Sequence, residues 1–342
     1  MRCAARGARS NRGTVPAPSS PSRPISSILP QNPSRFQPAP YTLMGVTETA
    51  AFQRFSAYKT REATIARIER LSTAFDRSDD LGLLGIGNAW SRLHYGSEFS
   101  LVRPSQSQTA VSLVFIQTND GNTGGPNPSA FGGGATDTHL IYEGLSRVAV
   151  DAVLAGAGSV HRDAFFSVWH PELAALRASL GLRRHPAQIV VSRRGRVDVD
   201  ALLFNVPDVP VFLMAGDECI ARHESALRAR PWVRLIPTNG VDLRPAFECL
   251  RGEEGIQRVS AIGGRFTATQ LVDAGLIQDI YLTTTSLEGG EFGTPWYAGA
   301  APPGLTAITS KQWDENGSSV VFEHCLITSP QESSSEFQQP GV

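Results

Sequence analysis

The sequence predicts an α/β protein whose mostly parallel central sheet has flanking helices and ends in an antiparallel C-terminal edge. From residue 109 onward, short apolar strand-like stretches alternate with helix-like stretches. This alternation is typical of right-handed βαβ units and of a parallel sheet covered on both faces. Near the C-terminus, the strand-like stretches 305–313 and 319–328 follow each other without a helix. Strands joined so directly are expected to pair antiparallel.

Runs rich in Val, Ile and Leu predict the other strands, at 110–117, 151–156, 187–192, 209–216, 232–237, 258–264 and 277–285. Apolar residues three or four positions apart predict helices at 135–150, 171–181, 218–230, 244–252 and 265–275. The same spacing predicts one amphipathic helix over 47–75, whereas 76–107 shows no regular pattern. Thr136 or Asp137 is a natural N-cap, and Pro171 and Gly181 fit the start and end of a helix.

Composition divides the chain into four parts. Residues 1–45 are rich in Pro, Ser and Arg and are expected to be a disordered tail, as are residues 330–342. Residues 46–107 form a helical or irregular N-terminal extension, and 108–329 form the main domain. The acid-free, Arg-rich start resembles an organelle transit peptide; it also fits a start codon placed too early, with Met44 as the later candidate. Otherwise a cytoplasmic location is expected.

Charge and composition exclude several classes of function. The net charge is −1, but six arginines lie in residues 1–47, which leaves 25 basic against 32 acidic residues in the rest. A net-acidic body argues against broad binding of nucleic acid. No run of about 18 apolar residues predicts a membrane span. The four cysteines and seven histidines show no metal-ligand spacing, so no metal site is expected.

Three predicted strand ends carry unusual residues, and ligands of open α/β sheets bind at such ends. They are Gly156-Ala157-Gly158-Ser159, Ser192-Arg193-Arg194 and Gly263-Gly264-Arg265. Glycines where a strand passes into a helix let backbone approach a pyrophosphate, and the helix N-terminus favours an anion. A hydroxyl and guanidinium groups can hold a phosphate monoester. Together they predict NADPH, although each stretch also fits a tight or solvated turn.

The motifs resemble those of a known family. "SAIGGRFTATQLVDAGLIQDIYLTT" followed by "GGEFGTPWYAG" resembles the closing part of the pyrimidine reductases of riboflavin biosynthesis, the RibD C-terminal-domain type, which have a dihydrofolate-reductase-like fold. "FIQTNDGNTGG" and "LSRVAVDAVLAGAGSV" resemble the family's first turn and its first crossover. The resemblance covers residues 109–328.

The resemblance implies an NADPH-dependent reductase, usually a homodimer, that turns the ribosyl group of a phosphoribosylaminopyrimidine into ribityl. The residues it places along NADPH are Gly156, Gly158, Ser159, Ser192, Arg193, Gly263, Gly264 and Arg265, with Arg194 beside them. Asp120 and Asp163 would face the substrate. One departure is that Asp163 is followed by Ala164 and Phe165, where the family often has Asp-Asp-Pro.

Candidate proton donors are Asp120, Glu143 and Asp163, although Asp120 also fits a turn cap and Glu143 a solvated helix residue. The glycine-rich segment 121–134 is a candidate flap over the site. Two other functions stay open. The substrate of the same fold and cofactor could be another pterin-like or carbonyl compound, or the chain could be a non-catalytic nucleotide-binding protein that interacts through its N-terminal helix.

Overall fold

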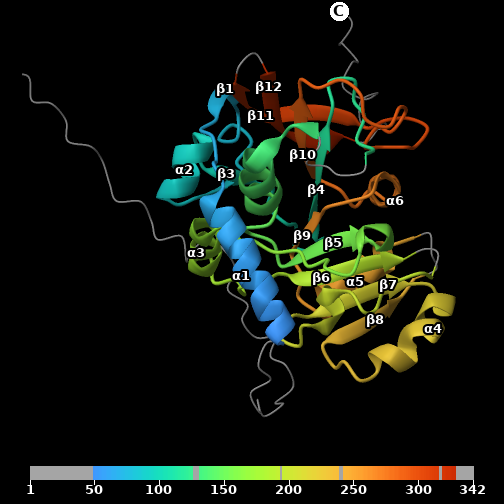
Figure 1. Cartoon of the computed structure of the whole chain (residues 1–342). Coiled ribbons are helices and arrows are strands. Elements are labelled where there is room, and N and C mark those ends of the chain that lie inside the picture. The colour runs from blue at the N-terminus through green and yellow to red at the C-terminus, as the bar shows by residue number, and fades with distance from the viewer. Residues whose placement is uncertain (1–48, 126–130, 193–194, 239–241, 316–317, 329–342) are drawn as a thin grey trace, which may run out of the picture.

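The computed structural model describes residues 49–125, 131–192, 195–238, 242–315 and 318–328. Within them, one ten-stranded sheet has the spatial order β1-β11-β12-β10-β4-β9-β5-β6-β7-β8 (Figure 1). Its strands are β1 (Ser72–Asp76), β4 (Ala110–Gln117), β5 (Ala152–Gly156), β6 (Ala187–Ser192), β7 (Val211–Ala215), β8 (Val233–Pro237), β9 (Arg258–Ala261), β10 (Asp279–Thr285), β11 (Gly304–Glu315) and β12 (Ser318–Thr328).

Strands β4 to β10 pair in parallel, whereas β12 pairs antiparallel with both β10 and β11. The predicted parallel sheet with an antiparallel C-terminal edge is therefore confirmed. Strand β9 comes late in the chain, yet it lies between β4 and β5 and pairs in parallel with both.

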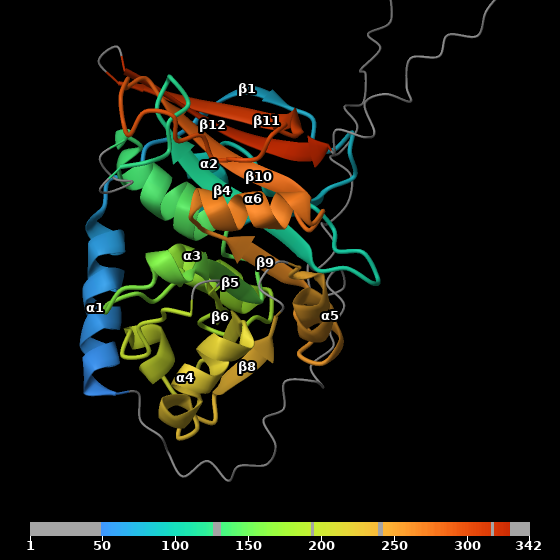
Figure 2. The ribbon, with the colours of Figure 1, turned by 90° about the vertical axis from the view of Figure 1, so that its right-hand side faces the viewer.

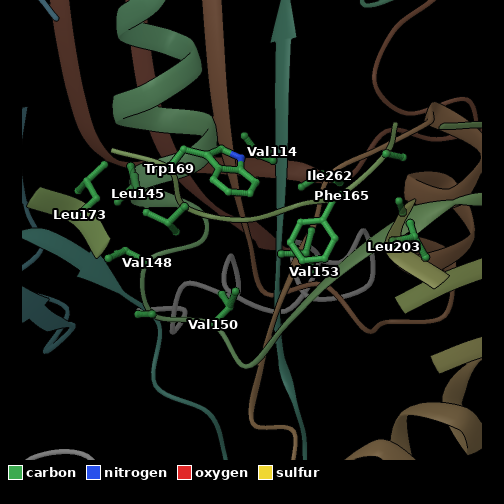
Figure 3. Packing of buried hydrophobic residues seen from close by; sticks show 14 of the residues in the cluster. Val114, Leu145, Val148, Val150, Val153, Phe165, Trp169, Leu173, Leu203 and Ile262 are labelled. Atoms are coloured by element: carbon green, nitrogen blue, oxygen red, sulfur yellow. The ribbon is translucent and has the colours of Figure 1, made fainter. Parts of the chain in front are cut away.

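Helices cover both faces of the sheet (Figure 2). They are α1 (Ala50–Ile65), α2 (Ala89–Tyr95), the π-helix η3 (Thr136–Leu145), α3 (Pro171–Ser179), α4 (Asp217–Leu227), α5 (Arg244–Gly252) and α6 (Arg265–Asp273). Helices α1, α2, η3, α3 and α4 share one core with the sheet, and α5 and α6 pack on the other face. Figure 3 shows the first core, where Phe165 and Trp169 pack near Val153 and Ile262. Among the described helices, none has the length and apolar character to cross a membrane.

The helix predicted over 47–75 is wrong beyond residue 65. Helix α1 ends at Ile65, and residues 72–76 form strand β1, which pairs antiparallel with β11. All five β1 side chains are exposed, so their pattern could not reveal a strand that exists because a distant partner supplies its hydrogen bonds. Residues 76–107, which showed no pattern, contain β2 (Leu84–Ile86), α2 and β3 (Phe99–Leu101).

A buried lysine ties this extension to the C-terminal hairpin. The Lys311 side chain is fully buried, and its Nζ donates hydrogen bonds to Thr73 Oγ1 at 2.9 Å, Ser97 Oγ at 2.9 Å and Asp76 Oδ2 at 3.2 Å. Burial lowers the pKa of Lys311, and the Asp76 carboxylate opposes that shift. The ammonium group also lies 5.0 Å from the centre of the Tyr95 ring. Every polar partner named here comes from the extension.

Removing the carboxylate partner of Lys311 is expected to destabilise the whole protein. Asp76→Ala should lower the free energy of unfolding by about 3 kcal/mol, because it leaves a buried charge without its counter-ion. Urea denaturation measures this. The control Glu98→Ala breaks the exposed Arg92–Glu98 pair and should cost less than about 1 kcal/mol. Equal effects of the two substitutions would contradict the role given to Lys311.

Helix α1 docks through an uncharged histidine. Phe52 is fully buried and packs with its ring centroid 5.4 Å from that of His185, which also contacts Phe165 and Trp169. The Nδ1 atom of His185 lies 2.7 Å from Ser167 Oγ. Burial, together with Arg184 and Arg177, lowers the pKa of His185 to about 3. The folded protein therefore holds this imidazole neutral.

Acid is expected to weaken the fold through His185. The unfolded chain binds a proton at His185 below about pH 6.5 and the folded chain does not, so stability is complete above that pH and falls between about 6.5 and 3. His185→Phe should reduce the loss between pH 7 and pH 4 by about 2–3 kcal/mol, measured by denaturation at each pH. Phe52→Leu, the control, should lower stability at both values. An unchanged loss in His185→Phe would contradict this account.

Candidate active site

Two glycine-containing turns meet at the carboxyl ends of β5 and β9. These strands are neighbours, with Leu154 opposite Ala261. A Cβ built on Gly156 would lie 2.6 Å from Thr267 Oγ1 and 3.9 Å from the Gly263 carbonyl oxygen. A Cβ on Gly263 would lie 3.4 Å from Ser159 Oγ. The structure thus brings together Gly156, Ser159 and Gly263, which the sequence predicted, and Thr267, which it did not. These four residues are called the glycine corner.

Helix α6 starts at this corner with free N–H groups. Its N-cap residue Gly264 has φ +70°, in the left-handed region that favours glycine, and no side chain caps the helix. The first N–H groups of a helix have no partner inside it and attract anions. Thr267, in the first turn, adds a hydroxyl that the sequence had not singled out. Its position three residues after Gly264, in the first turn of the predicted helix, could have indicated that it lies at the site.

Arg265 and Gly158, which the sequence also predicted along the cofactor, have different surroundings. The Arg265 guanidinium donates from Nη1 to the Gly293 carbonyl oxygen at 3.0 Å and lies 5.1 Å from the centre of the Phe266 ring. It is therefore held towards the β10–β11 loop. Gly158 has open space where a Cβ would stand, with no atom within 4 Å.

The end of β6 shows only part of the predicted phosphate clamp. Ser192 is its last residue and is buried. Arg193 and Arg194 lie outside the described residues. At the next strand end, helix α4 begins with Asp217 and Glu218, two acids that the sequence reasoning did not weigh. Arg222 lies between these regions, donating to the Gly195 carbonyl oxygen at 3.0 Å and to Glu218 Oε1 at 2.7 Å.

Asp120 belongs to a turn after β4. Its Oδ1 accepts a hydrogen bond from Thr118 at 2.5 Å and its Oδ2 accepts one from Asn122 at 2.9 Å. These bonds, with the Thr118 hydroxyl first, hold the pKa of Asp120 below its usual value. An exposed carboxylate kept ionised in this way caps its turn well but is poorly suited to donate a proton.

The other two predicted acids lie elsewhere. Glu143 is buried, and its Oε2 lies 3.0 Å from Nδ1 of the equally buried His139, one turn earlier in η3. It therefore contacts a helix neighbour and is not a solvated surface residue. Asp163 lies exposed after the turn that follows β5. The structure does not bring Asp120, Glu143 and Asp163 into one cluster, and their catalytic roles stay predictions.

A fourth carboxylate, Asp137, lies at the carboxyl ends of the strands. Its place in the sequence predicted only an N-cap. Its Oδ1 accepts a hydrogen bond from Thr283 Oγ1 of β10 at 2.5 Å. Burial raises the pKa of Asp137 to about 6, and the hydrogen bond from Thr283 opposes the rise only in part. A partly buried carboxyl that titrates near neutrality is typical of functional sites.

The glycine-rich segment predicted as a flap is anchored at its start. Thr123 N and Oγ1 both donate to the Thr294 carbonyl oxygen, at 2.8 and 2.7 Å, and Gly124 N donates to Thr294 Oγ1 at 2.9 Å. Asn122 Nδ2 donates to the Gly289 carbonyl oxygen at 3.1 Å. The β4–η3 and β10–β11 loops are therefore joined beside the site. Residues 126–130, in the middle of the segment, lie outside the described residues.

Comparison with protein families decides the relationship. The model of the RibD C-terminal domain matches residues 109–322. The chain belongs to this family. The family predicted from the sequence is therefore confirmed. Membership in it supports a pyrimidine reductase, and hence an oxidoreductase.

Solved structures share the fold of this RibD C-terminal domain protein. One is a pyrimidine reductase-like protein from Corynebacterium diphtheriae, with 18% identity and a TM-score of 0.52 over 65% of this chain and 92% of the other. Another is RibD from Acinetobacter baumannii, with 16% identity and a TM-score of 0.50 over 66% of this chain and 59% of the other. At such identities the likeness shows the fold alone. Among curated proteins, no sequence matches this one.

The glycine corner fits the pyrophosphate of a dinucleotide. The absence of a Cβ at Gly156 and Gly263 lets the Thr267 and Ser159 hydroxyls lie close to the two turns. These hydroxyls and the free N–H groups of α6 can donate to phosphate oxygens. Within the described part of the chain, no group of three or more His, Cys, Asp or Glu side chains could hold a metal ion.

Filling the corner with one methyl group should weaken dinucleotide binding. Gly156→Ala places a Cβ 2.6 Å from Thr267 Oγ1 and is expected to raise the NADPH dissociation constant at least about tenfold, or about 1.4 kcal/mol. Nicotinamide fluorescence measures this. Gly252→Ala in α5, where a Cβ meets no atom within 4 Å, should bind as the wild type does. Unchanged affinity in Gly156→Ala would rule out the corner as the pyrophosphate site.

Proposed function

We propose that this RibD C-terminal domain protein is an NADPH-dependent reductase that converts the ribosyl group of a phosphoribosylaminopyrimidine into ribityl, a step of riboflavin biosynthesis. The observation that carries the proposal is the glycine corner at the N-terminus of α6, formed by turns on the neighbouring strands β5 and β9. Family membership supports the reaction class.

In this proposal Gly156, Ser159, Gly263 and Thr267 hold the cofactor pyrophosphate, and Gly264 directs the N–H groups of α6 towards it. Bound NADPH would supply a hydride. The protein's own contribution is to place the acceptor carbon, exclude water and deliver a proton. The β4–η3 and β10–β11 loops, which hydrogen bonds join to each other, flank the edge where the parallel strands end and can shield it from solvent.

Family membership and the residues of the site together favour a phosphoribosylaminopyrimidine as the substrate. One observation favours a second candidate, a pterin-like or carbonyl substrate of the same reductase chemistry: Asp163 is exposed and is followed by Ala164 and Phe165, both packed in or against the core. Turnover of a phosphoribosylaminopyrimidine, measured as the loss of NADPH absorbance, distinguishes the two candidate substrate classes. A homodimer and a cytoplasmic location remain proposals.

Cofactor preference tests the predicted phosphate clamp. Titration of the wild-type protein should show micromolar NADPH binding, with NADH at least about tenfold weaker. Arg193→Ala should weaken NADPH far more than NADH, because a guanidinium contributes mainly by pairing with the 2′-phosphate.

The acids at the start of α4 sharpen this test. Asp217 and Glu218 stand at the strand end next to Ser192, and a carboxylate there would accept a hydrogen bond from a free 2′-hydroxyl. NADH binding as tight as NADPH, or equal losses of both in Arg193→Ala, would remove the phosphate-clamp assignment. Binding of neither dinucleotide would overturn the proposed function.

A further inference from the structure

Asp137 occupies a distinctive place in the fold. It lies in the first turn of η3, over the carboxyl ends of β4 and β10. Thr283, its hydrogen-bond partner, stands directly opposite Ile116 of β4 in the sheet. A Cβ built on Gly133 would meet both the Asp137 Cβ at 2.6 Å and the Ile116 Cδ1 at 2.7 Å. The carboxyl therefore sits between the sheet and the segment that leads into η3.

The strand offset brings this carboxyl near the glycine corner. Strand β4 continues to Gln117, whereas its neighbour β9 stops at Ala261, opposite Leu113. The turn at Gly263 and Gly264 therefore lies beside the last residues of β4. Neighbouring strands are about 4.8 Å apart, and only β4 stands between β10, which carries Thr283, and β9, which leads into the Gly263 turn. Asp137 and the glycine corner therefore lie at the same edge of the sheet, where the parallel strands end.

One carboxylate oxygen is held and the other is not. Oδ1 accepts from Thr283, and among the described residues no hydrogen bond or ion pair to Oδ2 is seen. The side chain is only partly exposed. It is oriented by a fully buried hydroxyl, yet keeps an oxygen for a ligand. Asp120 has both oxygens bonded and Glu143 faces His139, so neither offers this combination.

We propose that Asp137 is the catalytic acid of this reductase, oriented by Thr283; the inference rests on the proposed function. Bound NADPH would supply the hydride that C1′ of the ribosyl group accepts, and would leave as NADP⁺. The C1′–O4′ bond breaks, and its electron pair goes to O4′. Asp137 gives its proton to O4′, which becomes the 4′-hydroxyl of ribityl, and the carboxylate then takes a proton from water.

The titration of Asp137 agrees with this role. Its pKa of about 6 leaves a substantial protonated fraction near neutral pH. Its two causes are burial and the Thr283 hydrogen bond, and no charged neighbour contributes. Because Thr283 donates to the carboxylate, it favours the ionised form. Loss of the Thr283 hydroxyl should therefore raise the pKa of Asp137 further.

The first test uses the full chain and the isosteric variant Asp137→Asn. Turnover of a phosphoribosylaminopyrimidine with NADPH should fall by about 10²–10⁴-fold, while NADPH affinity and the thermal midpoint stay near wild type. The control Asp208→Asn makes the same chemical change on an exposed loop just before β7, at the opposite edge of the sheet, and should keep wild-type turnover. Retained turnover in Asp137→Asn would overturn the proposal.

The second test does not depend on turnover. Carbon-13 NMR of aspartate-labelled protein without cofactor should show one carboxyl titrating near pH 6 that is missing in Asp137→Asn. In Thr283→Val its midpoint should move up by about one unit, and the falling alkaline limb of the pH–rate profile should move with it. A midpoint near 4 in the wild type, or a limb that does not move, would overturn the role of Asp137. Failure of the proposed function itself would show separately, as absence of NADPH binding by the wild type.

Discussion

The insertion of β9 between β4 and β5 is the constraint on which the site depends. In a parallel sheet all carboxyl ends meet at one edge, so the strand that is threaded between two earlier ones decides which loops become neighbours. Here it places the Gly263–Gly264 turn against Gly156 and next to the end of β4. Strand β9 ends at Ala261, opposite Leu113, whereas β4 continues to Gln117. One topological choice thus brings the glycine corner and Asp137 to the same edge of the sheet.

The N-terminal extension is bound by a different kind of interaction. Its contacts with the main domain combine buried aromatic packing, at Phe52, with the ion pair of the fully buried Lys311 and the more exposed Asp76. A buried ammonium group is costly without its partners, so the C-terminal hairpin and the extension depend on each other. The neutral His185 beneath α1 adds a sensitivity to acid, since protonating it would place a charge among Phe52, Phe165 and Trp169. The extension therefore contributes to the stability of the fold as a whole.

Much of the fold could be predicted because its strands are buried on both faces. Runs such as Ala110–Gln117 and Ala187–Ser192 consist mostly of apolar residues, and their bounds in the structure match the predicted ones. Strand β1 could not be predicted, because its exposed residues gain strand structure only by pairing with β11, as in Thr73 opposite Lys311, 238 positions later in the sequence. The residues of the candidate site also differ in how far they could be predicted. Gly156 and Gly263 were identifiable as glycines at strand ends. Thr267 had only its position three residues after Gly264 to mark it, and Asp137 had no local feature that pointed to a role beyond capping a helix.

The sequence by itself determined the α/β class, the family and the glycines of the glycine corner, because strand periodicity and glycine placement are properties of short stretches. Tertiary structure alone decided which carboxyl lies where a proton is needed. Asp120, Glu143 and Asp163 were chosen by their position in motifs, yet they are dispersed, whereas Asp137 is oriented by Thr283, 146 positions away. A pKa depends on burial and on hydrogen bonds from distant residues, and those are set only when β10 pairs with β4 beneath the first turn of η3.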